Sequence, residues 1–400
     1  MAASRRAAFG FILATIFLEA LSFGLIFPVL PRLVLQLEGG DDAAAARAFG
    51  IIAAAWAAAN FFAAPVLGAL SDRFGRRPVL VASAFGFAAD LVVMAVAPNL
   101  VWLFLGRLIS GFTAGNFATA SAYLADITAP GQRAARFGVF AAVYGAGMIL
   151  GPAAGGVLGE ISPRAPFWVA AGVAGLMALY GFFVLPESLP PDKRGEVRTI
   201  NPFAAFGILR TPGLPKLAVI MTLVALGGTS ANTLFVLYVD HRYGWDAAAA
   251  GLLLTVFAAG NILVMGVIAP LAAKRAGEQA ALIAGLALCA VGFAGLALAS
   301  TGLLFALACI PMCLGNLCGP PLRALQTNLV DATQQGRLQG ALGGLQALAA
   351  LVGPLAFTQV YAQTLSQPGG FSGGALLVGS LLMAVATLIA FTIGDRPKAA

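Results

Sequence analysis

The sequence predicts an all-α membrane protein with twelve transmembrane helices. Of the 400 residues, 60% are hydrophobic and 10% are charged, whereas a soluble globular domain carries about a quarter charged residues. Apolar stretches long enough to cross a hydrocarbon layer of about 30 Å recur along the chain, and the two observations together exclude the soluble classes. The predicted spans are 9–30, 48–70, 79–97, 100–124, 138–158, 167–185, 216–238, 247–270, 280–299, 302–325, 339–361 and 373–393.

The spans fall into two halves of six. A long polar segment that begins PESLPPDKRGEV separates them, which predicts an N-terminal six-helix bundle over 1–185, a cytoplasmic loop over 186–215 and a C-terminal bundle over 216–400. A constant shift of 202 positions indicates internal duplication, because it superposes Gly75 on Gly277, Gly138 on Gly340, Gly151 on Gly353 and Pro152 on Pro354. Two parallel halves of this kind place a binding site between them, near mid-membrane.

Basic residues predict the orientation of the chain. Since the number of spans is even, both termini lie on one side, and the loops on that side hold 17 of the 23 Lys and Arg residues. An excess of Lys and Arg marks the cytoplasmic side. We therefore expect a protein of the cell inner (plasma) membrane with both termini in the cytoplasm. The net charge of +7 follows from this topology and predicts no nucleic-acid partner.

The stretch GALSDRFGRRPVL, residues 68–80, predicts a tight hairpin between two spans. Gly68 would allow close helix approach, Gly75 a left-handed turn, and Pro78 the first turn of the next helix. Asp72 is the one acid among three arginines, so it can pair with them or accept backbone N–H groups at a helix start. The alternative, a loop that is basic only because it is cytoplasmic, explains the arginines but not Asp72 or the glycines.

The span 138–158 carries a second pattern, made of glycines and one proline. Three of the glycines recur every four residues, which predicts a stripe along which another helix packs closely. The proline removes a backbone donor and can bend the helix. The members are Gly138, Gly147, Gly151, Pro152, Gly155 and Gly156. Helix packing without any further role is the alternative.

Three ionisable residues, Glu19, Asp90 and Arg107, lie deep in the predicted spans. At 1.5 Å per residue the two acids are about 15 Å, and Arg107 about 10 Å, from the membrane edge where their spans begin. Charge at this depth is costly unless it faces protein or water. Arg107 can neutralise only one acid, so the other is expected to take up a proton near neutral pH, and Glu19 is the candidate proton carrier. The alternative is a purely structural ion pair, such as Glu19–Arg107.

Residues for enzymatic or metal chemistry are scarce. The four cysteines lie within predicted spans, where a free cysteine behaves as a small hydrophobic residue, and Cys309 and Cys313 have no histidine or acid near them in the sequence. The chain has a single histidine, His241, and no GxxxxGK[ST] nucleotide loop. We therefore expect no enzyme, no cofactor and no metal site.

The stretch 68–80 resembles the signature loop of the major facilitator superfamily, whose pattern is G-x-L-a-D-r-x-G-R-R/K. In that family the loop is a conformational latch between the halves. The resemblance implies this role for Gly68, Asp72, Arg73, Gly75, Arg76 and Arg77. In the second half, Pro270 replaces the glycine and Lys274 the aspartate, so the first copy is expected to carry the latch.

Other stretches narrow the resemblance. The glycine pattern fits G-x8-G-x3-G-P-x2-G-G and resembles the motif of the proton-coupled antiporter branches. FLEALSFGLIFPVLP (17–31) and GEISPRAPFWVAA (159–171) look like the tetracycline-efflux group. In that group an acid matches Glu19 and an aspartate matches Asp90, while Cys289 stands where a third acid is expected.

The resemblance implies a proton-coupled secondary transporter, namely an antiporter that exports an amphipathic, drug-like or tetracycline-like molecule by alternating access. Arg107, within LGRLISG, resembles the arginine motif of proton-driven members. The expected partners are a small-molecule substrate, protons and the lipid bilayer, and the chain is expected to be a monomer. One alternative is a proton-coupled transporter of a lipid, sugar or other metabolite, in symport or in export, and another is a receptor that does not transport.

Overall fold

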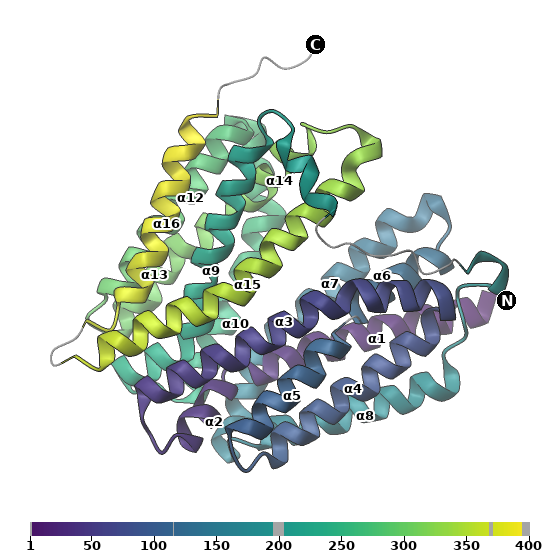
Figure 1. Ribbon diagram of the computed structural model, residues 1–400, viewed down its shortest axis with the longest axis horizontal. Helices are drawn as coiled ribbons and strands as arrows, with labels where there is room; N and C mark the ends of the chain where they lie inside the picture. Colours follow the sequence, from purple (N-terminus) through teal and green to yellow (C-terminus); the bar gives the residue numbers. More distant parts are fainter. Residues whose placement is uncertain (1, 115, 195–203, 368–370, 394–400) are drawn as a thin grey trace. The chain divides into compact units, whose positions relative to one another are not determined.

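The computed structural model describes residues 2–114, 116–194, 204–367 and 371–393. Within these ranges, twelve helices are long and apolar enough to cross a membrane, which confirms the predicted spans (Figure 1). The chain is therefore a multi-pass membrane protein. Residues 195–203 of the predicted cytoplasmic loop lie outside the described residues.

Some spans are single helices and others consist of two helices in sequence. The first six spans contain α1 (Ala2–Ile26) with α2 (Leu30–Leu37), α3 (Asp42–Phe74), α4 (Arg76–Val96), α5 (Leu100–Thr113) with α6 (Asn116–Ile127), α7 (Arg133–Ile161) and α8 (Ala165–Val184). The last six contain α9 (Leu214–Tyr243), α10 (Ala247–Leu263) with α11 (Ala269–Ala276), α12 (Glu278–Leu298), α13 (Gly302–Gly315) with α14 (Gly319–Thr327), α15 (Gln335–Leu365) and α16 (Gly374–Phe391). Short 3-10 helices at Pro130–Gln132, Pro191–Lys193, Ala204–Arg210 and Ala332–Gln334 lie between spans.

Prolines accompany the two breaks in the last six spans. A π-helical turn, Val264–Ile268, joins α10 to α11, and Pro270 lies in the first turn of α11. A 3-10 turn, Asn316–Cys318, joins α13 to α14, and Pro320 lies in the first turn of α14. Proline suits these positions because the first N–H groups of a helix have no intrahelical acceptor.

Helix bounds repeat between the first and second half of the sequence. The bounds of α4 and α5, shifted by 202, are the bounds of α12 and α13. Gly75 precedes α4 with φ 106° and ψ 160°, and Gly277 precedes α12 with φ 88° and ψ 160°. The side chains of Asn99 and Thr301 cap α5 and α13. The repeat seen in the glycine positions of the sequence thus extends to backbone geometry and helix capping.

The chain forms two compact units, and two helices belong to both. Unit 1 contains the described residues of 1–40, 51–200 and 245–255, and unit 2 contains those of 41–50, 201–244 and 256–400. The first turns of α3 therefore belong to unit 2, while the first turns of α10 belong to unit 1. The division into 1–185, 186–215 and 216–400 stays a prediction.

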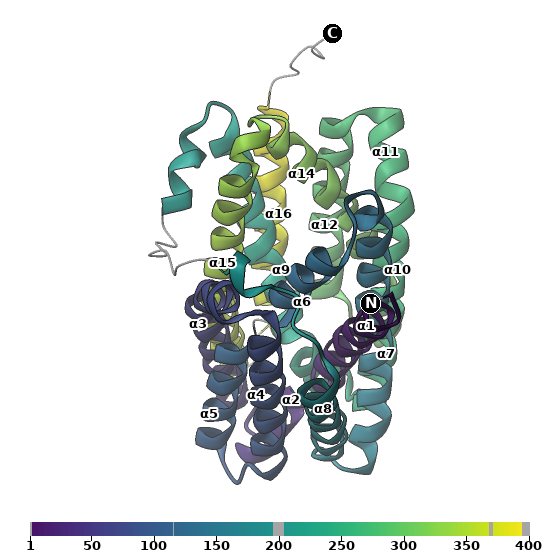
Figure 2. The same ribbon diagram turned by 90° about the vertical axis from the view of Figure 1, so that its right-hand side faces the viewer.

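Each unit has a core of apolar side chains. In unit 1, α1 packs on α7 and α4 packs on α8, around buried residues that include Ile12, Tyr123 and Phe140. In unit 2, α9 packs on α15 and α16 (Figure 2), and α12 packs on α13 and α16. Large apolar side chains such as Ile161 and Phe183 remain about three-quarters exposed, at 75% and 76%. Exposed apolar surface of this kind suits contact with lipid.

Candidate functional site

Asp90 and Arg107 form a buried ion pair between α4 and α5 in unit 1. The Arg107 Nη2 group donates a hydrogen bond to Asp90 Oδ2. Asp90 is fully buried and Arg107 is 5% exposed. Gly106 leaves space for the carboxylate, since a Cβ there would lie 2.9 Å from Asp90 Oδ1. Ser110, also buried, lies beside the same carboxylate. The guanidinium therefore compensates the negative charge of Asp90. The structure contains the pair Asp90–Arg107 in place of the alternative pair Glu19–Arg107.

Glu19, on α1, has a different environment. The residue is partly buried, and its Oε2 atom is enclosed without a hydrogen-bond partner in the described part of the chain. Tyr144 of α7 lies within electrostatic range of the carboxylate. A carboxylate oxygen that is enclosed without a hydrogen bond is costly while the group is ionised. This group can lower that cost by taking up a proton or by receiving a polar or cationic ligand.

An aromatic cluster continues from Tyr144. The ring of Phe117, on α6, meets the Tyr144 ring edge-on at 5.2 Å and lies 5.3 Å from the ring of Phe140. Phe117 is 46% exposed, while Phe140 is buried in the unit 1 core. The surroundings of Glu19 thus combine one carboxylate with aromatic surface, part of which is accessible.

The glycines of α7 are the places where two other helices approach it. Towards α1, a Cβ at Gly147 would lie 2.6 Å from Phe17 O, and a Cβ at Gly151 would lie 2.6 Å from Gly24 Cα. One turn later, a Cβ at Gly155 would overlap the α1 backbone. The predicted close packing along this stripe is therefore present, and its partner is the helix that carries Glu19.

A second face of α7 meets the first turns of α10, which belong to unit 1. A Cβ at Gly156 would lie 2.6 Å from Ala247 O, and a Cβ at Gly251 would overlap the carbonyl oxygen of Pro152. At Gly138, by contrast, a Cβ would meet no atom within 4 Å in the described structure. Close packing thus explains the C-terminal part of the glycine pattern but not Gly138.

The link between α3 and α4 is a single residue, Gly75. Its positive φ confirms the left-handed turn expected there. The backbone N–H groups of Arg76 and Arg77, at the start of α4, donate to the two oxygens of Glu187 at 2.9 and 3.3 Å. A Cβ at Gly75 would overlap that carboxylate. A carboxylate at a helix N-terminus is favourable because it satisfies free N–H groups and opposes the helix dipole.

Side-chain pairs complete this cluster. Asp72 accepts a hydrogen bond from Arg76 Nη1, which also donates to Ser71 Oγ at 3.1 Å. Arg76 Nε lies 3.4 Å from Asp126 Oδ2, and the Ser188 hydroxyl donates to the same oxygen at 3.0 Å. Of the two roles open to Asp72, the structure shows pairing with an arginine, while Glu187 binds the helix start.

The remaining residues of the predicted latch have separate contacts. Arg77 Nη2 donates to the backbone oxygen of Phe182 at 2.5 Å. The Arg73 guanidinium lies 5.2 Å from the centre of the Phe74 ring. The expectation of close helix approach at Gly68 is wrong in this structure, since a Cβ there would meet no atom within 4 Å in the described residues.

Glu187 and Asp126 are the residues that the sequence prediction missed. Glu187 is separated from its partner Arg76 by 111 positions, and Asp126 by 50. Their position in the sequence could have indicated them, because both acids follow the predicted cytoplasmic ends of spans, where basic residues dominate. An acid in such a loop has arginines to pair with.

Cys289, where the resemblance expected a third acid, is a packing residue in unit 2. It is 4% exposed on α12. A Cβ at Gly315, at the end of α13, would lie 2.5 Å from its sulfur. The thiol thus occupies the space between α12 and α13. Among the described residues, no three metal-ligating side chains lie together.

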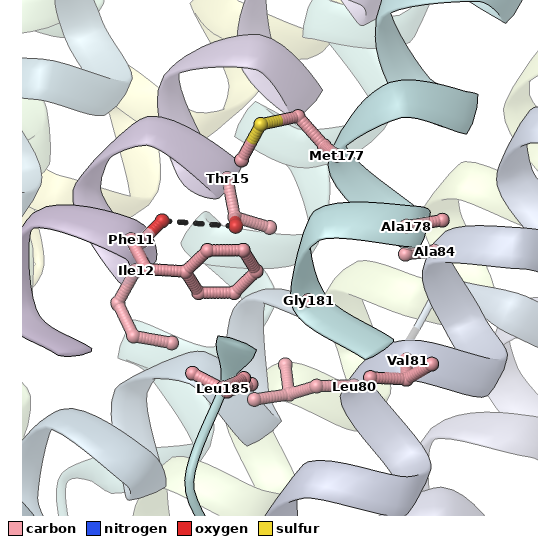
Figure 3. A pocket seen from close by; sticks show the side chains of 10 residues that line it. All are labelled: Phe11, Ile12, Thr15, Leu80, Val81, Ala84, Met177, Ala178, Gly181 and Leu185. Atoms are coloured by element: carbon pink, nitrogen blue, oxygen red, sulfur yellow. Dashed lines mark hydrogen bonds between the residues drawn. The ribbon is translucent and has the colours of Figure 1, made fainter. Parts of the chain in front are cut away.

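A small pocket lies among α1, α4 and α8 in unit 1 (Figure 3). Apolar side chains line it, and its one hydroxyl, that of Thr15, donates to Phe11 O at 2.9 Å. Its volume of about 10 Å³ is at the lower limit for one water molecule. This pocket is too small to hold a transported molecule, and neither Glu19 nor Asp90 lines it.

Comparison with known proteins agrees with this architecture. The family model described as Major Facilitator Superfamily matches residues 12–354. The tetracycline resistance protein, class C, of Escherichia coli is 40% identical over 94% of this chain and 94% of its own length. The class G protein of Vibrio anguillarum is 38% identical over 96% and 95%. The crystal structure of the nucleoside transporter NupG, 14% identical, shares the fold with a TM-score of 0.81 over 98% of this chain and all of that one.

The family match covers most of the chain, and the relatives match it over nearly their full length. The predicted fold class, twelve transmembrane helices of the major facilitator type, is therefore confirmed, as is the prediction that the chain is a transporter and not an enzyme. The chain belongs to the Major Facilitator Superfamily.

Proposed function

We propose that this transporter is a proton-coupled antiporter that exports an amphipathic, drug-like or tetracycline-like small molecule by alternating access. The names of its relatives support export of such molecules over transport of a lipid, sugar or other metabolite. The proposal of proton coupling rests on one observation in unit 1, namely that one of the two membrane-embedded acids is paired with an arginine and the other is not. Asp90 is paired with Arg107, whereas Glu19 Oε2 has no hydrogen-bond partner in the described structure.

The division of charge supports different roles for the two acids. Asp90 and Arg107 together are neutral, so the pair can persist through the transport cycle. Glu19 lacks such compensation, and protonation would make it neutral. Antiport requires that proton and substrate bias one conformational equilibrium in opposite directions. A single carboxylate that binds either a proton or the polar end of the substrate meets this requirement.

The aromatic cluster beside Glu19 supports an amphipathic substrate. Phe117 and Tyr144 offer ring surface to an apolar body, with Phe140 packed behind Phe117, while the carboxylate receives a polar or positively charged group. A cation placed over an aromatic ring gains further attraction. We infer that the substrate enters with its polar group towards α1 and its apolar part towards α6 and α7.

The cluster around Gly75 supports a latch role for Asp72, Gly75, Arg76 and Arg77, and the family resemblance extends the proposed role to Gly68 and Arg73. Its hydrogen bonds join α3, α4, α6 and the segment after α8 within unit 1. We infer that this network keeps the α3–α4 link rigid in one state and exchanges partners in the other. The glycines of α7, which bring α1 close to α7, are inferred to let the Glu19 helix move along it.

We propose a location in the inner (plasma) membrane, with lipid around a monomer, and the charge distribution supports an orientation with both termini in the cytoplasm. Most basic residues of the chain lie in loops on one side of the predicted spans. By the positive-inside rule that side is cytoplasmic. The latch cluster is then cytoplasmic, and the link between α9 and α10 is external.

Proton flux in liposomes that contain the purified protein tests the proposal. A pH gradient is imposed, and tetracycline, lipophilic cations and neutral amphiphiles are added in turn to wild type and to Glu19→Gln. We expect substrate-dependent proton movement in wild type that the variant lacks. Glu160→Gln is the matched control, because Glu160 is an exposed acid at the end of α7. Coupled flux that persists in Glu19→Gln would move the proton site elsewhere, and no coupled flux with any compound would refute drug export.

A further inference from the structure

His241 and Asp42 form a polar contact within unit 2 that the proposed transport site does not use. His241 lies in the last turn of α9 and Asp42 in the first turn of α3. The imidazole Nδ1 is 2.6 Å from Asp42 Oδ2, and the two side chains are 35% and 31% exposed. His241 is the single histidine of the chain. About a third of each side chain is therefore accessible to solvent.

The contact is part of a built junction between α3, α9 and α15. The Tyr361 ring of α15 meets the imidazole edge-on at 6.5 Å, and its hydroxyl donates to Leu237 O at 3.5 Å. Two turns along α3, a Cβ at Gly50 would overlap the Thr358 side chain of α15. The first turns of α3 thus lie directly against α15, and the His241–Asp42 contact closes the end of this junction.

Several titratable or charged groups surround the imidazole. On α3 these are Asp42 and, one residue earlier, Asp41, whose carboxylate accepts Ala44 N–H. On α9 they are Asp240 and Arg242, the chain neighbours of His241, and Tyr243 farther on. On α15 the group is the Tyr361 hydroxyl, which feels both Asp42 and Asp240. Of these groups, the Asp42 carboxylate is the one that contacts the imidazole nitrogen directly.

The contact holds the end of a helix that belongs to both units. α3 is a continuous helix of 33 residues, with its first turns in unit 2 and the rest in unit 1. Any rearrangement of unit 1 against unit 2 must therefore bend α3 or release its first turns. The first turns of α10 are the counterpart in unit 1, where Arg32 Nη2 donates to the backbone oxygen of Trp245 at 2.8 Å. The hydrogen bond between Arg32 and the Trp245 backbone oxygen does not titrate near neutral pH, whereas the contact at α3 contains a histidine.

We propose that His241 and Asp42 form a proton-dependent clasp that holds the first turns of α3 in unit 2 more firmly in acid than in alkaline medium. Histidine changes charge between about pH 5 and pH 8. A protonated imidazole forms a charge-assisted hydrogen bond with a carboxylate, whereas a neutral one forms a weaker bond and only in one tautomer. Acid outside the cell would thus oppose release of the first turns of α3 from unit 2, independently of proton uptake at Glu19.

Distance measurement between spin labels tests the clasp without substrate or proton flux. Nitroxides are placed at Arg47 on α3 and Gln363 on α15, both exposed and both in unit 2. In the background, alanine replaces Cys313, the cysteine that is not buried. We expect the short-distance population to rise about two- to fivefold relative to the long one between pH 8 and pH 5.5, as suits a partly exposed ion pair.

Two variants at position 241 separate the clasp from other effects of pH. His241→Gln is neutral at both pH values and should show the long distance with little pH dependence. His241→Lys is charged at both and should keep the short distance at pH 8. Asp42→Asn should behave as His241→Gln does.

The clasp is overturned if wild type shows no pH dependence, or if the shift persists unchanged in His241→Gln. The labelled Glu19→Gln protein should retain the shift, whereas its loss there would assign the pH response to the transport site instead. Failure of the antiport proposal would leave these distances unaffected, because the measurement needs no transported molecule.

Discussion

The buried pair of Asp90 and Arg107 leads to a prediction about stability and pH. In Arg107→Gln the positive charge is lost, while a polar side chain of moderate size remains on α5. Asp90 lies fully buried on α4, in the space that Gly106 leaves by having no side chain. The variant therefore leaves a carboxylate enclosed in protein without a cation.

The size of the effect follows from the burial of both partners. Removing one member of a buried ion pair costs about 3–5 kcal/mol, because the other charge is left uncompensated. Asp90 is 0% and Arg107 5% exposed, so solvent screens this charge little. We expect a loss of stability in this range at about pH 8, where the aspartate is ionised in the unfolded chain.

The loss should become smaller in acid. Protonation of Asp90 in the variant removes the uncompensated charge, so the folded variant binds a proton that the unfolded chain at the same pH does not. Stability then rises as pH falls, by the linkage between proton binding and folding. Wild type should show a smaller rise over the same range, because the Arg107 guanidinium favours the ionised aspartate and offsets part of the cost of burying it.

Thermal unfolding of the purified protein in detergent, at about pH 5 and pH 8, measures both effects. The double variant Asp90→Asn/Arg107→Gln should recover most of the loss, since neither charge remains, and the four proteins form a double-mutant cycle. Arg47→Gln is the control, because Arg47 is exposed and its replacement should change stability by less than about 0.5 kcal/mol. A variant Arg107→Gln as stable as this control at both pH values would refute the pairing, and with it the argument that leaves Glu19 as the uncompensated acid.

Two glycine substitutions test the packing around the latch and the α1–α7 contact. Gly75→Ala should destabilise the protein by about 1–3 kcal/mol in thermal unfolding, because φ is positive there and the new Cβ overlaps Glu187. Gly277→Ala, with positive φ but no atom within 4 Å, should cost less, and equal losses would contradict a role for the carboxylate. Gly151→Ala should lower both stability and transport rate, because its Cβ would lie 2.6 Å from the α1 backbone. Gly138→Ala meets open space and should leave both unchanged, and a loss of the same size there would show that α1 packing is not the cause.

Much of this architecture could be predicted from the sequence, because the information is local. Twelve apolar stretches determine twelve membrane-spanning helices, since each stretch must satisfy its own backbone within lipid. The depth of Glu19, Asp90 and Arg107 follows from counting residues along a helix. The turn at Gly75 and its repeat at Gly277 follow from a short pattern of residue types, and both glycines have positive φ.

Only the tertiary structure decided which of these groups meet. Hydropathy places Glu19 and Asp90 at similar depth, but α4 packs on α5, so Arg107 pairs with Asp90 and not with Glu19. Glu187 reaches the start of α4 from 111 positions away, and His241 reaches Asp42 from 199 positions away. Pairings over such separations depend on how helices are rotated and how closely they approach. Those quantities are set by side-chain packing across the whole bundle, and no local stretch of sequence contains them.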